Sequence, residues 1–169
     1  MATYHFVTRW LFQAPIEGLW GRLGKVAAWT DWLPQGVWRG AVRSAAADAG
    51  VGTVVDWQVR GFLPYTLRFS TEVTVFEPPT LMAVRSSGDL TGEGRVVLEP
   101  RDPGTAVTVY WDVATTHPLF NVVSCLPLIR TVMEKNHRYV MTRVYPALKP
   151  AIEGDQGTAR FAPPGSSLL

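Results

Sequence analysis

The sequence predicts an α+β domain in which an antiparallel sheet of about seven strands covers one long C-terminal helix. Upstream of His117, most segments alternate apolar and polar residues with the period of two that is typical of strands. Two short helical segments interrupt this alternation directly after the first strand. From Leu126 to Leu148 the apolar residues recur with helical spacing instead, over a length of roughly 33 Å.

The N-terminal segment predicts one strand followed by two short helices. The strand is expected over 3–12, where the aromatic residues share one face. The dipeptide at 14–15 then begins a helix, because proline is favoured at the first helical position, and Gly24 ends it. A second short helical segment is expected over 25–29.

The middle of the chain predicts a series of antiparallel strands. The alternation resumes at Val37, and turn residues follow at 61–64, 88–92 and 102–104. The connections are of hairpin length, so neighbouring strands are expected to run antiparallel. One face of each strand is apolar, and only the C-terminal helix is long enough to cover it. The strands after Val37 are clearest over 55–59, 65–75, 81–86, 95–99 and 107–113.

Composition argues against several classes of protein. Apolar residues make up 47% of the chain and charged residues only 18%, which favours apolar surface beyond that of a simple core. The net charge of +2, without a basic cluster, argues against binding of nucleic acid. A single cysteine allows no internal disulfide, and neither a signal peptide nor a membrane span is seen. We therefore expect a cytoplasmic protein with no integral membrane segment.

Several short motifs follow one another in an order and spacing that characterise one family. They comprise Ala14-Pro15 with Trp20; Trp29, Asp31, Trp32 and Pro34; Leu63-Pro64-Tyr65 with Arg68-Phe69; Gly88-Asp89-Leu90 with Gly92 and Gly94; Gly104-Thr105 with Val107; Trp111 with Val113; and Asn136-His137 with Met141 and Leu148. Through them the chain resembles the START-like, helix-grip superfamily, in particular the polyketide cyclase/dehydrase-type SRPBCC proteins. The resemblance covers about residues 4 to 149.

The resemblance implies a curved antiparallel sheet that grips the long helix, with a cavity between them. It implies a START-like ligand-binding domain over 1–150, and composition predicts a flexible tail over 151–169. Members of this superfamily bind sterols, phospholipids, polyketides, plant hormones or quinones. Some are aromatase/cyclases and others are ligand-gated interaction proteins, and no universal catalytic residue can be carried over to this chain.

His137 is the sharpest candidate for a functional residue. It lies near the middle of the long helix, on the stripe that faces the sheet. Its imidazole can be a core group satisfied by a neighbour, a hydrogen-bonding partner for a ligand, or a general acid or base. Asn136 is offset from it by about 100° around the helix, so we expect Asn136 to make a structural bond to the sheet or to helix-flanking backbone.

The predicted cavity wall combines aromatic residues of the strands with the apolar stripe of the helix. Trp29 and Trp32 flank the connection that, according to the resemblance, forms part of the cavity mouth. Ordinary packing is the alternative for each of these side chains. The predicted ligand-binding set is Trp29, Trp32, Trp57, Tyr65, Leu67, Phe69, Val109, Trp111, Met133, Asn136, His137, Val140 and Met141.

The sequence does not predict a metal or cofactor site. His5, His117 and His137 are dispersed without ligand spacing. Cys125 lies in an apolar segment with no base nearby in the sequence, which predicts a buried inert thiol. The segment 88–92 lacks the pattern of a phosphate-binding loop and is expected to be a turn.

Three functions remain open. The first is binding of a small hydrophobic or amphipathic ligand of lipid, polyketide or quinone type, without catalysis. The second is a polyketide cyclase or dehydratase that uses His137 as acid or base. The third is an interaction module with a vestigial cavity, which docks a partner or a second copy as a homodimer.

Overall fold

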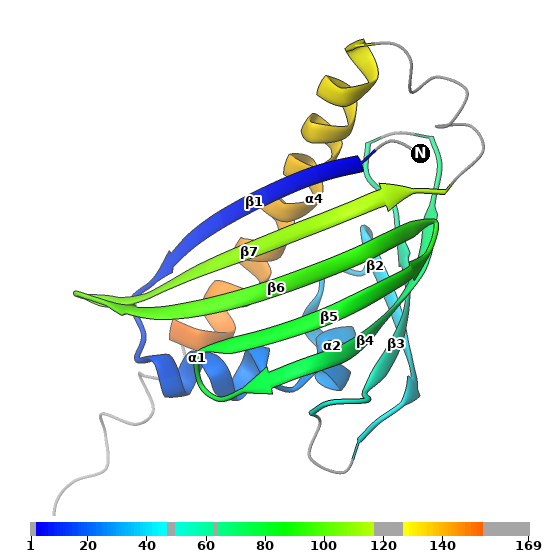
Figure 1. Cartoon of the computed structure of the whole chain (residues 1–169). Helices are drawn as coiled ribbons and strands as arrows, with labels where there is room; N and C mark the ends of the chain where they lie inside the picture. The colour runs from blue at the N-terminus through cyan, green and yellow to red at the C-terminus, as the bar shows by residue number, and fades with distance from the viewer. Residues whose placement is uncertain (1–2, 47–49, 63, 117–126, 154–169) are drawn as a thin grey trace, which may run out of the picture.

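Seven antiparallel strands form one curved sheet that wraps around a long C-terminal helix (Figure 1). The computed structural model describes residues 3–46, 50–62, 64–116 and 127–153. The strand order is β1-β7-β6-β5-β4-β3-β2. The strands are β1 (Thr3–Phe12), β2 (Trp38–Ser44), β3 (Val54–Val59), β4 (Leu67–Glu77), β5 (Leu81–Gly88), β6 (Leu90–Arg101) and β7 (Gly104–Thr115).

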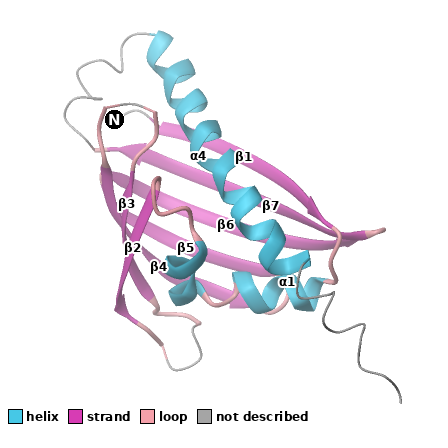
Figure 2. Cartoon of the chain, turned by 180° about the vertical axis from the view of Figure 1, so that it is seen from behind, coloured by secondary structure: helices cyan, strands magenta, loops and turns pink. Residues whose placement is uncertain are grey.

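The helices all lie on one side of the sheet. Figure 2 shows α4 crossing the concave face, with α1 beside one end of it. The short helices follow β1 directly, as predicted, and confirm the α+β helix-grip architecture. Their bounds are α1 (Ile16–Leu23), the 3-10 helix η1 (Val26–Ala28), α2 (Trp29–Trp32) and α4 (Pro127–Glu153).

The two faces of the sheet differ as the alternation predicts. In the β1–β7 pair, Phe6 lies opposite Trp111 and Thr8 opposite Val109. Directly paired residues of an antiparallel sheet point to the same face, so these side chains face the helix together. The intervening residues make polar contacts at the surface, such as the hydrogen bond between His5 Nδ1 and Asp112 Oδ1 at 2.9 Å.

The predicted turn at 88–92 is shorter in the structure. Gly88 ends β5 with a φ of 114°, a conformation that favours glycine, and β6 already begins at Leu90. Asp89 is held by β4, because its Oδ2 accepts from the Arg68 backbone N–H at 2.8 Å and its own N–H donates to the Arg68 carbonyl at 2.9 Å. Because Asp89 is fixed in this way, the strand β6 can begin at the next residue, Leu90. The glycines at 88 and 92 instead predicted a longer turn.

Helix α4 extends beyond the predicted end at Leu148 to Glu153, although Pro146 and Pro150 lie within it. A proline inside a helix removes one hydrogen bond and costs about 3 kcal/mol. Packing offsets this cost, because Leu148 is fully buried and Ile152 is almost so. The predicted end at Leu148 is the last residue counted in the apolar stripe, and Ile152 continues that stripe one turn later.

The apolar interior divides into two clusters. One joins Leu148 and Ile152 to β1, β6, β7 and α1, and closes one end of the space beneath α4. The other lines the rest of the concave face and includes Met133, Val140 and Val144 of α4. The incompletely filled part of this interior is the candidate site.

Some predictions concern residues outside the described ranges, namely His117, the connection that contains Cys125, and the tail from residue 154 onwards. Within the described residues, no helix is long and apolar enough to cross a membrane. No group of three metal-ligating side chains comes together in that same part of the chain.

Candidate ligand cavity

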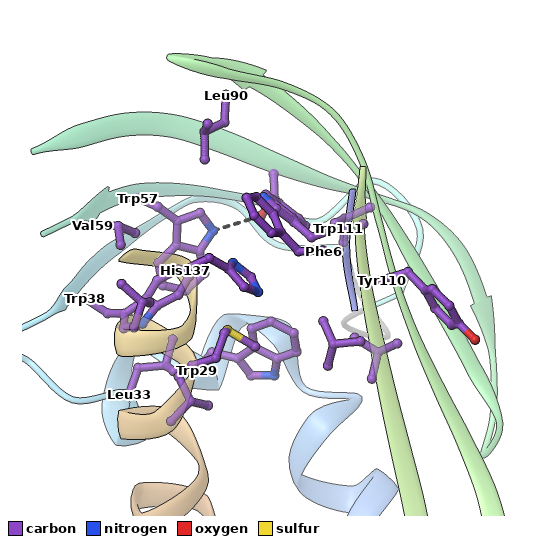
Figure 3. Close-up of a pocket in the computed structure, with 18 of the residues that line it drawn as sticks. Phe6, Trp29, Leu33, Trp38, Trp57, Val59, Leu90, Tyr110, Trp111 and His137 are labelled. Carbon is purple, nitrogen blue, oxygen red and sulfur yellow. Dashed lines mark hydrogen bonds between the residues drawn. The ribbon is translucent and has the colours of Figure 1, made fainter. Parts of the chain in front are cut away.

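A cavity of about 170 Å³ lies between α4 and the concave face of the sheet. All seven strands contribute to its wall, although β2 does so only through its first residue, Trp38. Helix α2 contributes two tryptophans. Figure 3 shows the aromatic side chains of Phe6, Trp29, Trp38, Trp57 and Trp111 gathered around His137. The wall is therefore dominated by apolar and aromatic groups, as in sites for small apolar molecules.

Most of the predicted site residues line this cavity. Among the predicted ligand-binding set, Tyr65 is the exception. Those that line it are Trp29, Trp32, Trp57, Leu67, Phe69, Val109, Trp111, Met133, Asn136, His137, Val140 and Met141.

Tyr65 supports the wall from behind. Its hydroxyl donates to Met133 Sδ at 3.4 Å, and Met133 itself borders the cavity. Burial raises the pKa of Tyr65 to about 12, with a smaller contribution from Tyr4. The phenol is therefore neutral and cannot act as a base near pH 7.

Sequence reasoning missed several wall residues. Tyr4, Phe6 and Trp10 share the inner face of β1, and Trp38 begins β2. The signal for the first three was present, because they alternate along β1 with their aromatic rings on one face. Trp38 stands at the start of a strand, where the alternation is too short to assign its face.

His137 is held at the wall by two residues of β1. Its ring stacks on Phe6 with centroids 4.2 Å apart and an angle of 6° between the ring planes. Its Nε2 lies 3.4 Å from Thr8 Oγ1, a weak hydrogen bond in which the roles depend on the tautomer. Burial lowers the pKa of His137 to about 4, so the imidazole is neutral near pH 7 and offers one donor and one acceptor.

His137 also separates the cavity from a groove outside. This groove of about 580 Å³ runs between β1 and α4 and is bordered by charged residues such as Arg9, Glu134 and Arg138. Phe6, Trp10, His137 and Met141 border both spaces. The stacked pair of Phe6 and His137 therefore forms a thin partition between an apolar interior and a polar surface.

Asn136 makes the structural bond predicted for it. Its Oδ1 accepts from the backbone N–H of Phe62 at 3.1 Å, which ties α4 to the connection between β3 and β4. A Cβ on Gly61 would lie only 1.9 Å from this oxygen, so the close approach requires glycine there. Asn136 borders the cavity as well, but its acceptor is already used.

We expect Asn136→Ala to lower the free energy of unfolding by about 1–3 kcal/mol, because the Phe62 N–H is left without its acceptor. Amide hydrogen exchange at Phe62 should accelerate by more than the global loss of stability explains. The exposed neighbour Lys135 offers the control Lys135→Ala, which should change neither quantity. Unchanged exchange at Phe62 in Asn136→Ala would contradict the role of this bond.

The chemical capacity of the cavity is limited. Among its described lining residues there is no carboxylate. Figure 3 shows the ring of Tyr110 on the far side of the sheet from His137. The guanidinium of Arg95 lies over that ring, 5.0 Å from its centroid. The described part of the wall thus offers His137 neither a carboxylate nor a second imidazole as a partner, and acid–base chemistry usually employs two titrating groups. Binding of an apolar ligand needs only the apolar wall, whereas acid–base catalysis would need a second titrating group as well.

Solved structures share the fold at low sequence identity. The protein TTHA0849 from Thermus thermophilus is 19% identical, with a TM-score of 0.69 over 88% of this chain and 99% of the other. The Zhui aromatase/cyclase from Streptomyces sp. R1128 is 16% identical, with a TM-score of 0.63 over 98% of this chain and 100% of the other. The di-domain ARO/CYC StfQ from the steffimycin biosynthetic pathway is 16% identical, with a TM-score of 0.67 over 92% of this chain and 52% of the other.

A comparison of the sequence with protein-family models identifies the family, which the similar folds alone do not. No match was found among curated protein sequences. Residues 4–149, which include every strand and most of α4, match the family model described as polyketide cyclase / dehydrase and lipid transport. This chain therefore belongs to the polyketide cyclase / dehydrase and lipid transport family.

Proposed function

We propose that this protein binds a small hydrophobic or amphipathic molecule in the cavity between α4 and the sheet. The observation that carries the proposal is a space of about 170 Å³ left open within an otherwise apolar interior. Empty space in a core lowers stability by a few kcal/mol at this size, and larger side chains would remove it. A ligand that fills the cavity recovers this free energy at about 25 cal/mol per Å² of apolar surface buried.

The family and the related folds are consistent with this proposal but leave the ligand open. The family description includes lipid transport as well as cyclase and dehydrase activities. A lipid, a polyketide or a quinone would each meet an apolar wall with few polar groups. We also propose that the ligand-binding domain spans residues 1–150 and that the protein is cytoplasmic, which its lone cysteine favours.

The test is direct binding to the purified full chain. We expect displacement of a fluorescent apolar probe by small apolar molecules, and retention of a co-purified ligand in native mass spectrometry after gentle purification. Failure of every apolar probe to bind, at concentrations up to its solubility limit, would contradict the proposal.

An enzymatic role in cyclisation or dehydration of a polyketide-like substrate is the second candidate. It is favoured by the neutral imidazole of His137 at the cavity wall and by the aromatase/cyclase names of the related structures. A neutral His with a low pKa accepts a proton poorly near pH 7, which weakens this candidate. Replacing His137 by alanine with binding retained and turnover unchanged would remove it.

An interaction module has less support. The exposed large apolar side chains among the described residues lie on different elements, with Val7 and Leu11 on β1 and Val42 on β2. Scattered apolar residues of this kind are normal on a protein surface. A homodimer remains a prediction that light scattering tests.

A further inference from the structure

Strand β1 presents a long and regular edge on its outer side. The two outermost strands of the sheet are β1 and β2 (Figure 1). The register of β2 shifts between Val42 and Ser44, and an irregularity of this kind blunts a strand edge. β1 instead pairs with β7 in one unbroken register from Thr3 to Phe12. Its outer edge therefore keeps the geometry that a further strand needs.

Alternate residues of β1 direct their backbone groups away from β7. In an antiparallel pair, each residue points its N–H and its C=O to the same side, and that side alternates along the strand. The Leu11 carbonyl accepts from the Tyr145 hydroxyl of α4 at 3.1 Å, so Leu11 belongs to the outward set. His5, Val7 and Arg9 have the same phase along β1 as Leu11. Their N–H and C=O groups therefore face outward as well.

The hairpin between β6 and β7 gives the same phase. Arg101 ends β6 and pairs with Gly104, which begins β7, so the hairpin is closed by a hydrogen-bonded pair. Counting in steps of two from Gly104, the even-numbered residues of β7 bond to β6 and the odd-numbered ones bond to β1. Val109 is one of the latter, and its partner on β1 is Thr8. The even-numbered residues of β1 thus bond to β7, and the odd-numbered ones face outward.

The outward backbone groups open into the groove between β1 and α4. Every residue from His5 to Trp10 borders this groove. Because side chains alternate between the two faces of a strand, an unbroken run of this kind indicates that the backbone edge itself forms the floor. The outer groups of Val7 and Arg9 make no backbone hydrogen bond within the described part of the chain. The run is about 20 Å long, which matches an extended segment of about six residues.

The groove combines apolar surface with positive charge. Its apolar part is bordered by Trp10, Met141 and Tyr145. Glu134 and Arg138 lie one turn apart on α4, and opposite charges at this spacing offset each other. Arg9 is exposed and makes no ion pair with a described residue. The groove therefore favours a segment that carries apolar side chains together with an acidic one.

A second copy of this chain is a poorer occupant of the groove. Pairing of two β1 strands about a two-fold axis would bring the same surface of both copies together. The two Arg9 side chains would then lie near each other on one face of the joined sheet, and like charges on paired strands are destabilising. An acidic residue on the incoming strand would instead be attracted by Arg9.

We propose that this groove binds an extended, acidic and apolar peptide segment of a partner protein, which adds to β1 as a further antiparallel or parallel strand. The backbone of the segment pairs with the outward groups of His5, Val7 and Arg9. Its apolar side chains face α4, and its acidic side chain lies on the other face beside Arg9. This surface lies outside the cavity, so the proposal is independent of the ligand that the cavity binds.

The probe is the hexapeptide acetyl-Val-Thr-Val-Glu-Val-Thr-amide, titrated into the ¹⁵N-labelled full chain and followed by NMR. The amide signals of Val7 and Arg9 should move downfield as their N–H groups gain acceptors. Those of Phe6 and Thr8, which already bond to β7, should change less. A counterpart with lysine in place of glutamate should bind about threefold more weakly, since an exposed ion pair contributes little more than this.

Methylation of peptide nitrogens tests strand addition without any change in the protein. Directly paired residues point to the same face, so the threonine and glutamate residues should pair with the outward residues of β1. Methyl groups on the nitrogens of the glutamate and one threonine should weaken binding at least tenfold, because two hydrogen bonds are lost. Methyl groups on two valine nitrogens, which point away from β1, should change it less than about threefold.

Variants of β1 test the same edge from the side of the protein. Val7→Pro removes an outward N–H and leaves the bonds to β7 in place, and proline is tolerated on an edge strand. It should weaken peptide binding at least tenfold, with the circular dichroism spectrum and the binding of cavity probes unchanged. The matched control Val7→Thr keeps the N–H and should bind the peptide as the wild type does. Arg9→Glu should reverse the preference between the glutamate and lysine peptides.

Several outcomes would overturn the proposal. These are failure of both peptides to bind at millimolar concentration, equal effects of the two methylation patterns, and undiminished binding by a folded Val7→Pro variant. If that variant does not fold, the methylated peptides decide alone. A wild-type dimer in light scattering that Val7→Pro converts to a monomer would show that a second copy occupies the edge instead.

Discussion

Replacing Val109 by tryptophan is expected to weaken binding of apolar ligands at least tenfold while leaving the fold intact. Val109 lies on β7 opposite Thr8, so its side chain faces α4 and borders the cavity. An indole at this position would occupy the space that a ligand would fill. The loss of affinity follows because the ligand then has to displace a covalently attached side chain.

The stability of this variant distinguishes an open cavity from a packed core. Insertion of a large side chain into a filled core costs about 1–3 kcal/mol. If the space is open, Val109→Trp should instead change the free energy of unfolding by less than about 1 kcal/mol, measured by chemical denaturation. Val42→Trp, on the exposed part of β2, is the matched control and should alter neither binding nor stability. Strong destabilisation with probe binding retained would show that the cavity is not the site.

The alternation of apolar and polar residues was sufficient to predict the sheet. The first strand was predicted over 3–12 and is found there, because Tyr4, Phe6, Trp10 and Phe12, with Thr8 among them, leave one assignment of faces. The same logic predicted most of the cavity wall, since concave-face residues of a sheet that grips a helix must meet beneath that helix. The helical spacing of the apolar residues, and not the alternation, predicted His137 at the wall and Asn136 in a structural bond.

The remaining features depend on contacts that no local pattern contains. Trp38 lines the cavity because β2 pairs with β3 in a register that places it opposite Val59, with its ring against that of Trp57, and this register is a property of the assembled sheet. Tyr65 alternates correctly but precedes β4, and its hydroxyl turns to Met133 instead. The absence of acceptors for the buried indole N–H groups of Trp32 and Trp38 among the described residues is likewise visible only once all neighbouring groups are in place.

Acidification from pH 7 to pH 4 is expected to destabilise the protein through His137, by about 3 kcal/mol. The folded state holds the pKa of His137 at about 4, well below its ordinary value of 6.5, because burial penalises the imidazolium ion. Between these two values the unfolded chain binds a proton that the folded chain does not. Stability is therefore highest above pH 6.5 and falls as the pH decreases toward 4.

The variant His137→Leu isolates this contribution. Leucine keeps an apolar contact with Phe6 but cannot titrate, so its free energy of unfolding should fall by about 3 kcal/mol less than that of the wild type over the same pH interval. Carboxylates elsewhere, such as Asp56 with its lowered pKa, act in both proteins and cancel in the difference. Urea denaturation at half-unit steps of pH measures both curves. Parallel curves would mean that His137 is protonated equally in the folded and unfolded states. That result would contradict the conclusion that burial between cavity and groove keeps the imidazole neutral.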